Sequence, residues 1–327
     1  MAQCQVFKWT LAHLHTCTLA HMSTFSHIPV LYDEVLDLLR PQANGRYIDG
    51  TLGAGGHAAG VLQKSAPSGR ILVFDKDAEA IAFAQKQLTF FGDRVTYVHA
   101  SYAEMGTLAT QHGFAQVDGI LLDLGLSSRQ LDNPERGFSF MKEGPLDMRF
   151  DTTKGETAAD LINNLDETIL ADILWRYGEE KSSRKIAQMM VAERPFTTTT
   201  QLAEKIAQTV RRRGRIHPAT QTFQALRIAV NRELETVETG VMAALELLGQ
   251  NGRLAVISFH SLEDRFVKQT FRQLSQDCTC PPEQPVCTCG GQAKFRLITR
   301  KAVQASAEEI AQNSRSRSAR LRVIEKK

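Results

Sequence analysis

Residues 46–57 read Arg-Tyr-Ile-Asp-Gly-Thr-Leu-Gly-Ala-Gly-Gly-His, a short run that ends in an acidic residue and a glycine-rich turn. This pattern predicts a β-strand over residues 46–49, then a tight turn, then a helix over residues 57–63. Glycines at such a turn permit positive φ angles and let a ligand approach the backbone, while the helix N-terminus presents free N–H groups. The segment therefore predicts a nucleotide-type binding turn at the start of an α/β fold.

The alternation of strand and helix patterns continues along the chain. A helix is expected over residues 78–88, and further strands over residues 70–75, 94–99, 117–123 and 253–259. Such alternation predicts a parallel sheet with helices on its faces. Two last strand-like runs, residues 294–300 and 319–325, are expected as an antiparallel pair that closes the edge of the sheet.

An insertion separates the fourth expected strand from the fifth. The interval from Asp123 to Arg253 is about four times the thirty or so residues of an ordinary βαβ unit. Residues 155–209 have the apolar periodicity of several helices, and residues 222–248 form one long amphipathic pattern that leads into the fifth strand. We expect an inserted helical domain for substrate recognition over residues 134–216, within a sheet domain made of residues 22–133 and 217–327.

The N-terminal stretch does not resemble a targeting signal. Residues 1–21 are mildly apolar, but three histidines interrupt them, and a charged start followed by an apolar core is lacking. Met22 is the expected start, with residues 1–21 either an over-extended gene model or a tail. No window has the roughly eighteen uninterrupted apolar residues of a membrane span. A cytoplasmic protein without a membrane partner is expected, and its oligomeric state stays open between monomer and homodimer.

Charge is unevenly distributed along the chain, although its 39 Lys and Arg against 36 Asp and Glu leave a net charge of only +3. Residues 181–215 and 290–327 each carry a net charge of +7, which leaves −11 on the rest. A solvated charged surface is the ordinary explanation, but two basic segments on an acidic chain favour RNA. The arginines expected to contact phosphates are Arg211, Arg212, Arg213, Arg215, Arg315 and Arg317.

Six cysteines are too few for a disulfide framework in a chain of 327 residues. Four of them lie close together in a stretch rich in Pro and Gly: Cys278, Cys280, Cys287 and Cys289. Four thiolates suit a tetrahedral zinc site, but the usual spacing is Cys-x-x-Cys rather than Cys-x-Cys, so zinc ligands and plain loop cysteines both stay open. No acid/base motif surrounds these cysteines. Any zinc would therefore be structural, and no catalytic metal is expected.

A carboxylate ends each of the first two strands. Asp75 lies twenty residues after Gly55, where a carboxylate binds ribose hydroxyls. Asp49, just before the turn, suits a ligand with an ammonium group. The dinucleotide fingerprint Gly-x-Gly-x-x-Gly is not met, because it would require glycine in place of Ala58. S-adenosylmethionine (SAM) has an amine, a ribose and an adenine but no pyrophosphate. A SAM site is therefore favoured over an NAD site, with a plain turn and a surface Asp as the alternative.

The fourth strand ends in Asp-Gly-Ile-Leu-Leu-Asp-Leu-Gly-Leu-Ser-Ser, residues 118–128. In a doubly wound sheet the carboxyl ends of the strands border the ligand crevice, so Asp123 is expected beside the transferable methyl group. A carboxylate there would accept hydrogen bonds from an exocyclic amine and align its nitrogen with the methyl carbon. A helix N-cap is the alternative for Asp123. Methylation at carbon 5 of cytosine needs a Cys nucleophile, which residues 123–128 and 258–261 lack, so a nitrogen or oxygen acceptor is expected.

Aromatic residues follow the acceptor loop. Arg136, Phe138 and Phe140 lie close together in the sequence and would suit stacking on a base that is splayed from its neighbours. From their spacing alone, the favoured alternative is that the two phenylalanines anchor the inserted domain. His260, at the end of the fifth strand, similarly suits a histidine satisfied by local hydrogen bonds.

Six blocks of sequence resemble one known family. They are residues 49–57, 118–128, 136–140, 144–149, 217–234 and 258–265, the last reading Ser-Phe-His-Ser-Leu-Glu-Asp-Arg. Together they look like the bacterial 16S rRNA cytosine-N4 methyltransferases of the RsmH/MraW type, and the likeness runs from about His27 to the C-terminus. The resemblance implies a Rossmann-like class I SAM-dependent methyltransferase sheet with an inserted all-helical domain. It also implies methylation at N4 of a cytidine in the decoding centre of 16S rRNA, in the small ribosomal subunit.

The resemblance further implies which residues contact SAM: Gly55, Gly56, His57, Asp75, Tyr102, Asp123 and Gln130. Tyr102 stands where relatives often have Phe, and either ring would pack on adenine. The acceptor loop lacks the Pro-Pro-aromatic sequence of DNA amino-methyltransferases, so the aromatic residue that stacks on the cytosine stays open. Two rival functions remain: a nicotinamide oxidoreductase, which Ala58 opposes, and a ribosome-assembly factor that keeps the fold only to bind RNA.

Overall fold

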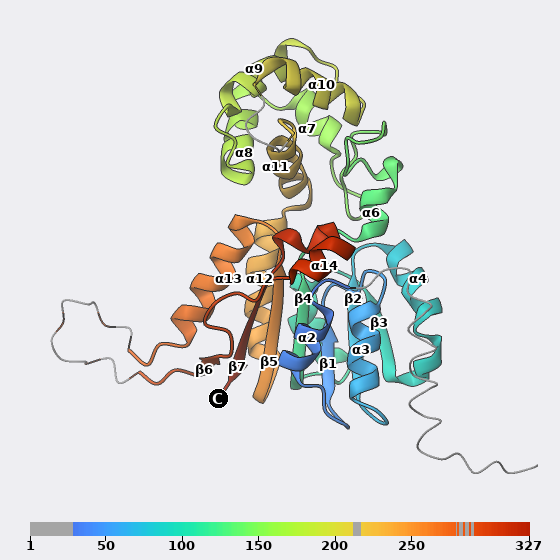
Figure 1. Cartoon of the computed structure of the whole chain (residues 1–327), viewed down its shortest axis with the longest axis vertical. Coiled ribbons are helices and arrows are strands. Elements are labelled where there is room, and N and C mark those ends of the chain that lie inside the picture. The colour runs from blue at the N-terminus through green and yellow to red at the C-terminus, as the bar shows by residue number, and fades with distance from the viewer. Residues whose placement is uncertain (1–28, 212–216, 279, 281–283, 285–287, 289–290) are drawn as a thin grey trace, which may run out of the picture.

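The computed structural model describes residues 29–327 except residues 212–216, 279, 281–283, 285–287 and 289–290. In this part of the chain seven strands form one sheet in the order β3-β2-β1-β4-β5-β7-β6 (Figure 1). They are β1 (Arg46–Asp49), β2 (Arg70–Asp75), β3 (Val95–His99), β4 (Val117–Asp123), β5 (Leu248–Ser258), β6 (Phe295–Leu297) and β7 (Arg320–Lys326). This order, with one reversed strand beside β5, is that of the class I SAM-dependent methyltransferases, which confirms the expected fold class.

The sheet is parallel except at one edge. Strands β1 to β5 pair in parallel, whereas β7 runs antiparallel to both β5 and β6. The expected antiparallel pair at the C-terminus is therefore confirmed, although β6 is shorter than the predicted run. Strand β5 begins at Leu248, earlier than predicted, because Leu248 pairs with Val117 across an irregularity in the ladder with β4.

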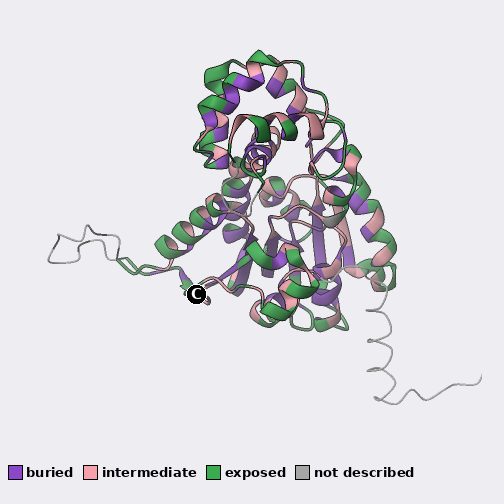
Figure 2. Ribbon diagram, turned by 45° about the horizontal axis from the view of Figure 1, so that its top comes forward, coloured by how far each residue is buried: buried purple, intermediate pink, exposed green. Residues whose placement is uncertain are grey.

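Helices cover both faces of the sheet. One face packs against α2 (Tyr32–Leu39), α3 (Gly56–Lys64) and α4 (Ala78–Gln87), and the other against α5 (Met105–Gln111), α12 (Glu233–Leu247) and α13 (Ser261–Leu274). Consecutive strand residues point to opposite faces, so Tyr47 belongs to the first hydrophobic cluster and Ile48 to the second. Figure 2 shows the strands buried and these helices buried mainly on the side that faces the sheet.

A layer of helices stands over the carboxyl ends of the strands (Figure 1). It contains α7 (Ala158–Asn164), α8 (Glu167–Gly178), α9 (Ser183–Ala192), α10 (Thr199–Thr209) and α11 (Thr220–Asn231). Their apolar faces form a third hydrophobic cluster, separate from the two against the sheet. Residues Phe223 and Leu226 of α11 belong to this cluster, so α11 packs with the helical layer.

The long amphipathic pattern over residues 222–248 is broken in the structure. Arg232 has φ 49° and ψ 45°, in the left-handed region, and separates α11 from α12. The Nδ2 atom of Asn231 donates hydrogen bonds to the carbonyl oxygens of Met148 and Arg227, which fixes the chain at this bend. We therefore propose that the chain returns from the helical layer to the sheet at Arg232, later than the predicted boundary at residue 217.

The other described elements are short: α6 (Ser128–Asp132), α14 (Ala307–Gln312), and the 3₁₀ helices η1 (Thr89–Arg94), η2 (Tyr102–Glu104), η3 (Pro134–Arg136) and η4 (Ser314–Ser318). Residues 1–21 and Met22 lie outside the described part of the chain. None of the helices in the described part has both the length and the apolar character that crossing a membrane requires.

Candidate active site

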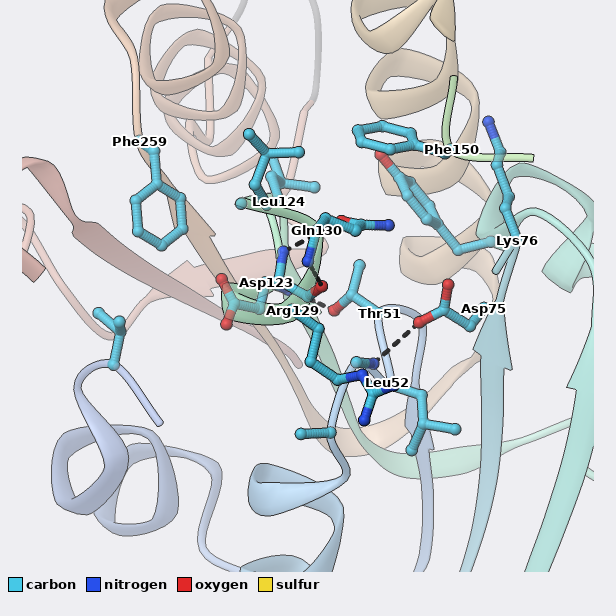
Figure 3. Close-up of a pocket in the computed structure, with 18 of the residues that line it drawn as sticks. Thr51, Leu52, Asp75, Lys76, Asp123, Leu124, Arg129, Gln130, Phe150 and Phe259 are labelled. Atoms are coloured by element: carbon cyan, nitrogen blue, oxygen red, sulfur yellow. Dashed lines mark hydrogen bonds between the residues drawn. The ribbon is translucent and has the colours of Figure 1, made fainter. Parts of the chain in front are cut away.

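A cleft of about 630 Å³ lies at the carboxyl ends of the parallel strands, beneath the helical layer (Figure 3). The loops after β1, β2, β4 and β5 and the start of α12 line it. The predicted SAM contacts that line this cleft are Gly56, His57, Asp75, Tyr102, Asp123 and Gln130. Gly55, the remaining predicted contact, directly precedes Gly56 at the start of α3. The fold thus brings the predicted residues together from separate parts of the chain.

The glycine-rich turn has the geometry that its sequence predicts. Gly53 has φ 51°, and Gly55, the N-cap of α3, has φ 82°, conformations that favour glycine. A Cβ atom on Gly56 would lie 2.4 Å from Cγ of Pro29, so no side chain fits there without movement. The turn therefore carries the backbone past the cleft and presents the N-terminal N–H groups of α3.

Asp75 is held rigidly at the end of β2. The backbone N–H of Gly53 donates to Oδ2 and that of Asp77 to Oδ1, both over 2.9 Å. Each carboxylate oxygen keeps a lone pair, which suits the two hydroxyls of a ribose. Burial raises the pKa of Asp75, and the two backbone hydrogen bonds partly offset this rise.

Asp49 lies under the turn, with 2% of its surface exposed. The backbone N–H and the hydroxyl of Thr51 donate to its Oδ1 over 3.0 and 3.4 Å, and the Thr51 hydroxyl also accepts the backbone N–H of Asp123 over 2.7 Å. Burial raises the pKa of Asp49 to about 7, and the charge of Asp75 contributes to the rise. Thr51 thus joins the ends of β1 and β4 and holds two acidic residues close together.

Asp123, which lines the cleft, has one unsatisfied carboxylate oxygen. Its Oδ1 is buried and has no hydrogen-bond partner among the described residues. Burial raises the pKa of Asp123 to about 7, and the charges of Asp49 and Glu263 contribute. The N-cap of α6 is Ser127, so Asp123 is not the helix cap that was its alternative. Buried carboxyls gathered without enough cations favour a positively charged ligand.

These features fit SAM. Asp75 and Asp123 line the cleft and Asp49 lies beneath the glycine turn, so their carboxyl groups would supply the negative charge that the ammonium and sulfonium groups of SAM require. The unpaired Oδ1 of Asp123 is the kind of orphaned acceptor that a bound ligand satisfies.

His57 is a neutral wall of the cleft. Its Nε2 lies 3.1 Å from the carbonyl oxygen of Val30, and burial lowers the pKa of the ring to about 4. The 3.9 Å between its Nδ1 and Oδ2 of Asp123 therefore separates an uncharged ring from the carboxyl group. His57 shapes the cleft beside Asp123 and does not neutralise its charge.

Tyr102 packs tightly against α12. A Cβ atom added to Gly240 of that helix would lie 2.3 Å from Cδ2 of the Tyr102 ring. Burial raises the pKa of the Tyr102 hydroxyl well above its usual range, so the group stays neutral. The ring offers a fixed apolar wall, as expected for a residue that packs on adenine.

Gln130 holds the acceptor loop together. Its Nε2 donates to Oδ2 of Asp77 over 3.2 Å, and its Oε1 accepts the backbone N–H of Ser127 over 3.2 Å. The same Asp77 oxygen accepts a hydrogen bond from Arg136 over 2.7 Å. Asp77 was not recognised in the sequence, although an Asp before a helix is a frequent N-cap, and it caps α4 here.

The aromatic residues after the acceptor loop divide into two groups. Phe138 and Phe140 pack within or against the helical cluster, which agrees with the anchoring alternative. Phe150, in contrast, lines the cleft, as does Phe259 after β5 (Figure 3). Arg136 donates to the carbonyl oxygen of Phe150 over 2.9 Å and so fixes the loop that carries this ring.

A second polar cluster lies at the cleft, and its two glutamates were not singled out in the sequence. Glu233 and Glu263 line the cleft with 6% and 1% of their surfaces exposed. Both oxygens of Glu233 accept hydrogen bonds from Arg227, over 2.7 and 2.8 Å. His260 is the N-cap of α13 and forms a capping box with Glu263. These residues lie within the blocks 217–234 and 258–265, which carried the family resemblance.

The predicted RNA-binding arginines are only partly described. Arg211 is exposed just after α10, whereas Arg212, Arg213 and Arg215 lie outside the described residues. Arg317 is exposed, and Arg315 lines the cleft and pairs with Asp132 over 2.5 Å. Two other basic residues of the C-terminal segment, Arg320 and Arg322, pair with Asp264. Part of the positive charge of residues 290–327 is therefore paired with acidic residues of the protein itself.

The zinc hypothesis gains no support. Cys287 and Cys289 lie outside the described residues. Within the described part of the chain, the group of side chains spaced closely enough to share a metal ion is Glu233, His260 and Glu263, which includes neither Cys278 nor Cys280.

The sheet order, the glycine turn and the carboxylates at the ends of β1, β2 and β4 define a class I SAM-dependent methyltransferase. The chain belongs to the MraW methylase family, whose model matches residues 24–327.

Relatives with high identity span nearly the whole chain. One from Geobacter sp. (strain M21), called ribosomal RNA small subunit methyltransferase H, is 51% identical over 311 residues, covering 93% of this chain and 100% of the relative. Another of that name, from Thermomicrobium roseum, is 52% identical over 305 residues, covering 92% and 94%. A solved SAM-dependent O-methyltransferase from Thermotoga maritima has a TM-score of 0.40 at 12% identity, covering 93% of this chain and 69% of that one.

Proposed function

We propose that this protein transfers the methyl group of SAM to the N4 amine of a cytidine in the decoding centre of 16S rRNA, and that it acts in the cytoplasm. The observation that carries the proposal is the buried, unpaired Oδ1 of Asp123 at the edge of the acidic cleft. The name that the relatives share, ribosomal RNA small subunit methyltransferase, supports the choice of substrate.

Different residues of the cleft would bind different parts of the cofactor. Asp75 would hold the ribose hydroxyls, and the ring of Tyr102 would pack on the adenine. The N-terminus of α3 would hold the carboxylate group of the methionine part, and the charge of Asp49 beneath the glycine turn would attract its ammonium group. In this arrangement Asp123 would lie toward the methyl group, because β4 is the neighbour of β1 in the sheet.

SAM, when bound, would supply an electrophilic methyl carbon for N4, and its sulfur would keep the electron pair of the broken carbon–sulfur bond. Because the lone pair of a cytosine amine is delocalised into the ring, the protein's task is to align N4 with that carbon. Asp123 accepts an N4–H hydrogen bond at its free oxygen. N4 loses one proton after attack, and a carboxyl group with a pKa of about 7 is suited to take it.

The surroundings of the cleft suit an RNA substrate. Arg315 at its rim and the exposed Arg211 and Arg317 would contact phosphates. Phe150 and Phe259 offer rings on which a flipped base would stack. We propose that the helical layer, together with residues 134–216 generally, positions the rRNA over the cleft.

The test combines methylation with cofactor binding. Purified protein, SAM and 30S subunits from a strain that lacks the gene should yield N4-methylcytidine on nucleoside mass spectrometry. Asp75→Ala should lose most SAM affinity in calorimetry, and full affinity would overturn the ribose assignment. Asp123→Ala should lose transfer far more than SAM affinity. Equal losses would reduce Asp123 to a cofactor contact, and 5-methylcytidine as the product would contradict the proposal itself.

A further inference from the structure

Arg227, Glu233 and Glu263 line the cleft where α11, α12 and α13 meet, and His260 lies directly beside Glu263. The proposed mechanism does not use these four side chains. An oxygen of Glu233, a ring nitrogen of His260 and an oxygen of Glu263 lie within 4.8 Å of one another. Their side chains are nine-tenths or more buried, at 6%, 7% and 1% exposure. Buried groups of this kind are expected to be fully hydrogen-bonded, so any that is not needs an explanation.

His260 is not fully hydrogen-bonded. Its Nδ1 accepts the backbone N–H of Glu263 over 3.4 Å, so the ring proton is on Nε2. That Nε2 lies 3.1 Å from Oε1 of Glu263, yet it has no hydrogen bond of acceptable geometry among the described residues. The site therefore holds an N–H donor and a carboxylate acceptor side by side that do not satisfy each other.

Only one of the two carboxylate oxygens of Glu263 accepts hydrogen bonds from the backbone. Its Oε2 accepts the backbone N–H groups of Phe259 and His260 over 2.9 and 3.3 Å. Its Oε1 remains as the acceptor beside His260. The charge of Glu263 contributes to the raised pKa values of both Asp123 and Tyr102, so the carboxylate lies near both groups.

A metal ion does not suit this cluster. The guanidinium of Arg227 already binds both oxygens of Glu233, and a cation there would be repelled by it. In the tautomer that the N-cap requires, Nε2 of His260 carries a proton and has no lone pair to donate. A ligand with an N–H donor next to an acceptor is complementary instead.

We propose that Glu263 and His260, with Glu233 and Arg227 behind them, form the subsite that reads the pairing edge of the target base. This inference rests on the proposed function. Oε1 of Glu263 accepts a hydrogen bond from the N4 amine of cytosine, and Nε2–H of His260 donates to the neighbouring N3. Uracil presents an acceptor at O4 and a donor at N3, the reverse pattern, so the subsite selects cytidine over uridine.

Two conservative variants test the assignment. Glu263→Gln keeps an oxygen for the cap of α13 but replaces the free acceptor by an NH₂ donor. His260→Asn keeps a good N-cap residue and removes the Nε2–H group. Each should lower the rate of methylation of 30S subunits at least ten-fold, with SAM affinity within about two-fold of wild type. The matched control is Asp160→Asn, which changes the equivalent N3 residue of the capping box of α7, away from the cleft.

The decisive readout is base selectivity. Affinities are measured for reconstituted 30S subunits that carry cytidine or uridine at the target position. Wild type should prefer cytidine, and Glu263→Gln should lose or invert that preference, because its amide donates to O4 of uracil. A merely structural Glu263 would leave the ratio unchanged.

The outcomes separate the two claims. If wild type methylates the subunits and both variants do so equally well with unchanged selectivity, the subsite is wrong while the proposed function stands. If wild type forms no N4-methylcytidine, the proposed function itself fails. A stoichiometric divalent metal in the purified wild-type protein that Glu263→Gln lacks would show a cation site and overturn the base-reading assignment.

Discussion

We expect the buried Asp49 to lower the stability of the protein without SAM and to favour SAM binding. The variant Asp49→Asn tests both expectations. Burial raises the pKa of the group from 3.8 to about 7. At about 1.36 kcal/mol for each pKa unit, ionising it in the folded state lowers the free energy of unfolding by roughly 4 kcal/mol. Because 2% of the residue is exposed, solvent screening reduces this figure little.

The sign of the effect defines the pH window. Well below pH 4 the Asp49 carboxyl group is protonated in both the folded and the unfolded chain, so it does not change the free energy of unfolding. As the pH rises from 4 to 7 the unfolded chain releases this proton and the folded protein keeps it, so wild type loses stability. Asparagine does not titrate and its Oδ1 can keep both hydrogen bonds from Thr51.

The assay is urea unfolding of both proteins without SAM between pH 4 and pH 8. Between pH 4 and pH 8 the free energy of unfolding of Asp49→Asn should rise relative to that of wild type by roughly 3 to 4 kcal/mol. Any effect of the substitution that does not depend on pH adds a constant to this difference and leaves the rise unchanged. SAM affinity of the variant should fall about ten-fold in calorimetry, since the substitution removes a carboxyl group whose ionised form, in the proposed arrangement, attracts the ammonium group of SAM. A stability difference that is the same at pH 4 and pH 8 would refute the reasoning.

Three further predictions address other parts of the site. Gly240→Ala places a Cβ 2.3 Å from the Tyr102 ring, so calorimetry should show weaker SAM binding and thermal unfolding a loss of about 1 to 3 kcal/mol. Unchanged SAM binding would mean that the ring does not depend on its contact with α12. Arg136→Met leaves Asp77 buried without its cation and should lower the free energy of unfolding by about 3 to 5 kcal/mol in urea. A loss below 1 kcal/mol would show that Gln130 suffices as a partner. Replacing Arg317 by Gln should weaken 30S binding and reduce its logarithmic salt dependence by about 0.7, whereas an unchanged slope would remove this residue from the RNA interface.

Local sequence patterns were sufficient to predict the sheet and the three Asp residues at the carboxyl ends of its strands. The apolar runs, the glycines at positions 53, 55 and 56 and the acidic residues that end β1, β2 and β4 act through their immediate neighbours. Parallel strands then bring Asp49, Asp75 and Asp123 to the same edge of the sheet without further information.

The acceptor side depends on contacts between distant residues, which no local pattern reveals. Neither glycine nor proline marks the bend at Arg232, and the helical period continues through it. The bend is held by the hydrogen bond from Asn231 to Met148, more than eighty residues earlier in the chain. That bend starts α12 at Glu233 and so brings this carboxylate to Arg227 and to the cleft.

The role of Gln130 also depends on a contact with a distant residue, which no local pattern reveals. The resemblance placed it among the SAM contacts, and it does line the cleft, but its amide nitrogen is used by Asp77, more than fifty residues away. Sequence reasoning identified the residue, whereas only the structure shows that its side chain shapes the acceptor loop.

The most direct test of the proposed function maps methylated cytidines in 16S rRNA from cells with and without the gene. We expect one N4-methyl group in the decoding centre to disappear on deletion, to return with the wild-type gene and to stay absent with the Asp123→Ala variant. An unchanged methylation map after deletion would refute the proposed function and leave a protein that keeps the methyltransferase fold only to bind RNA.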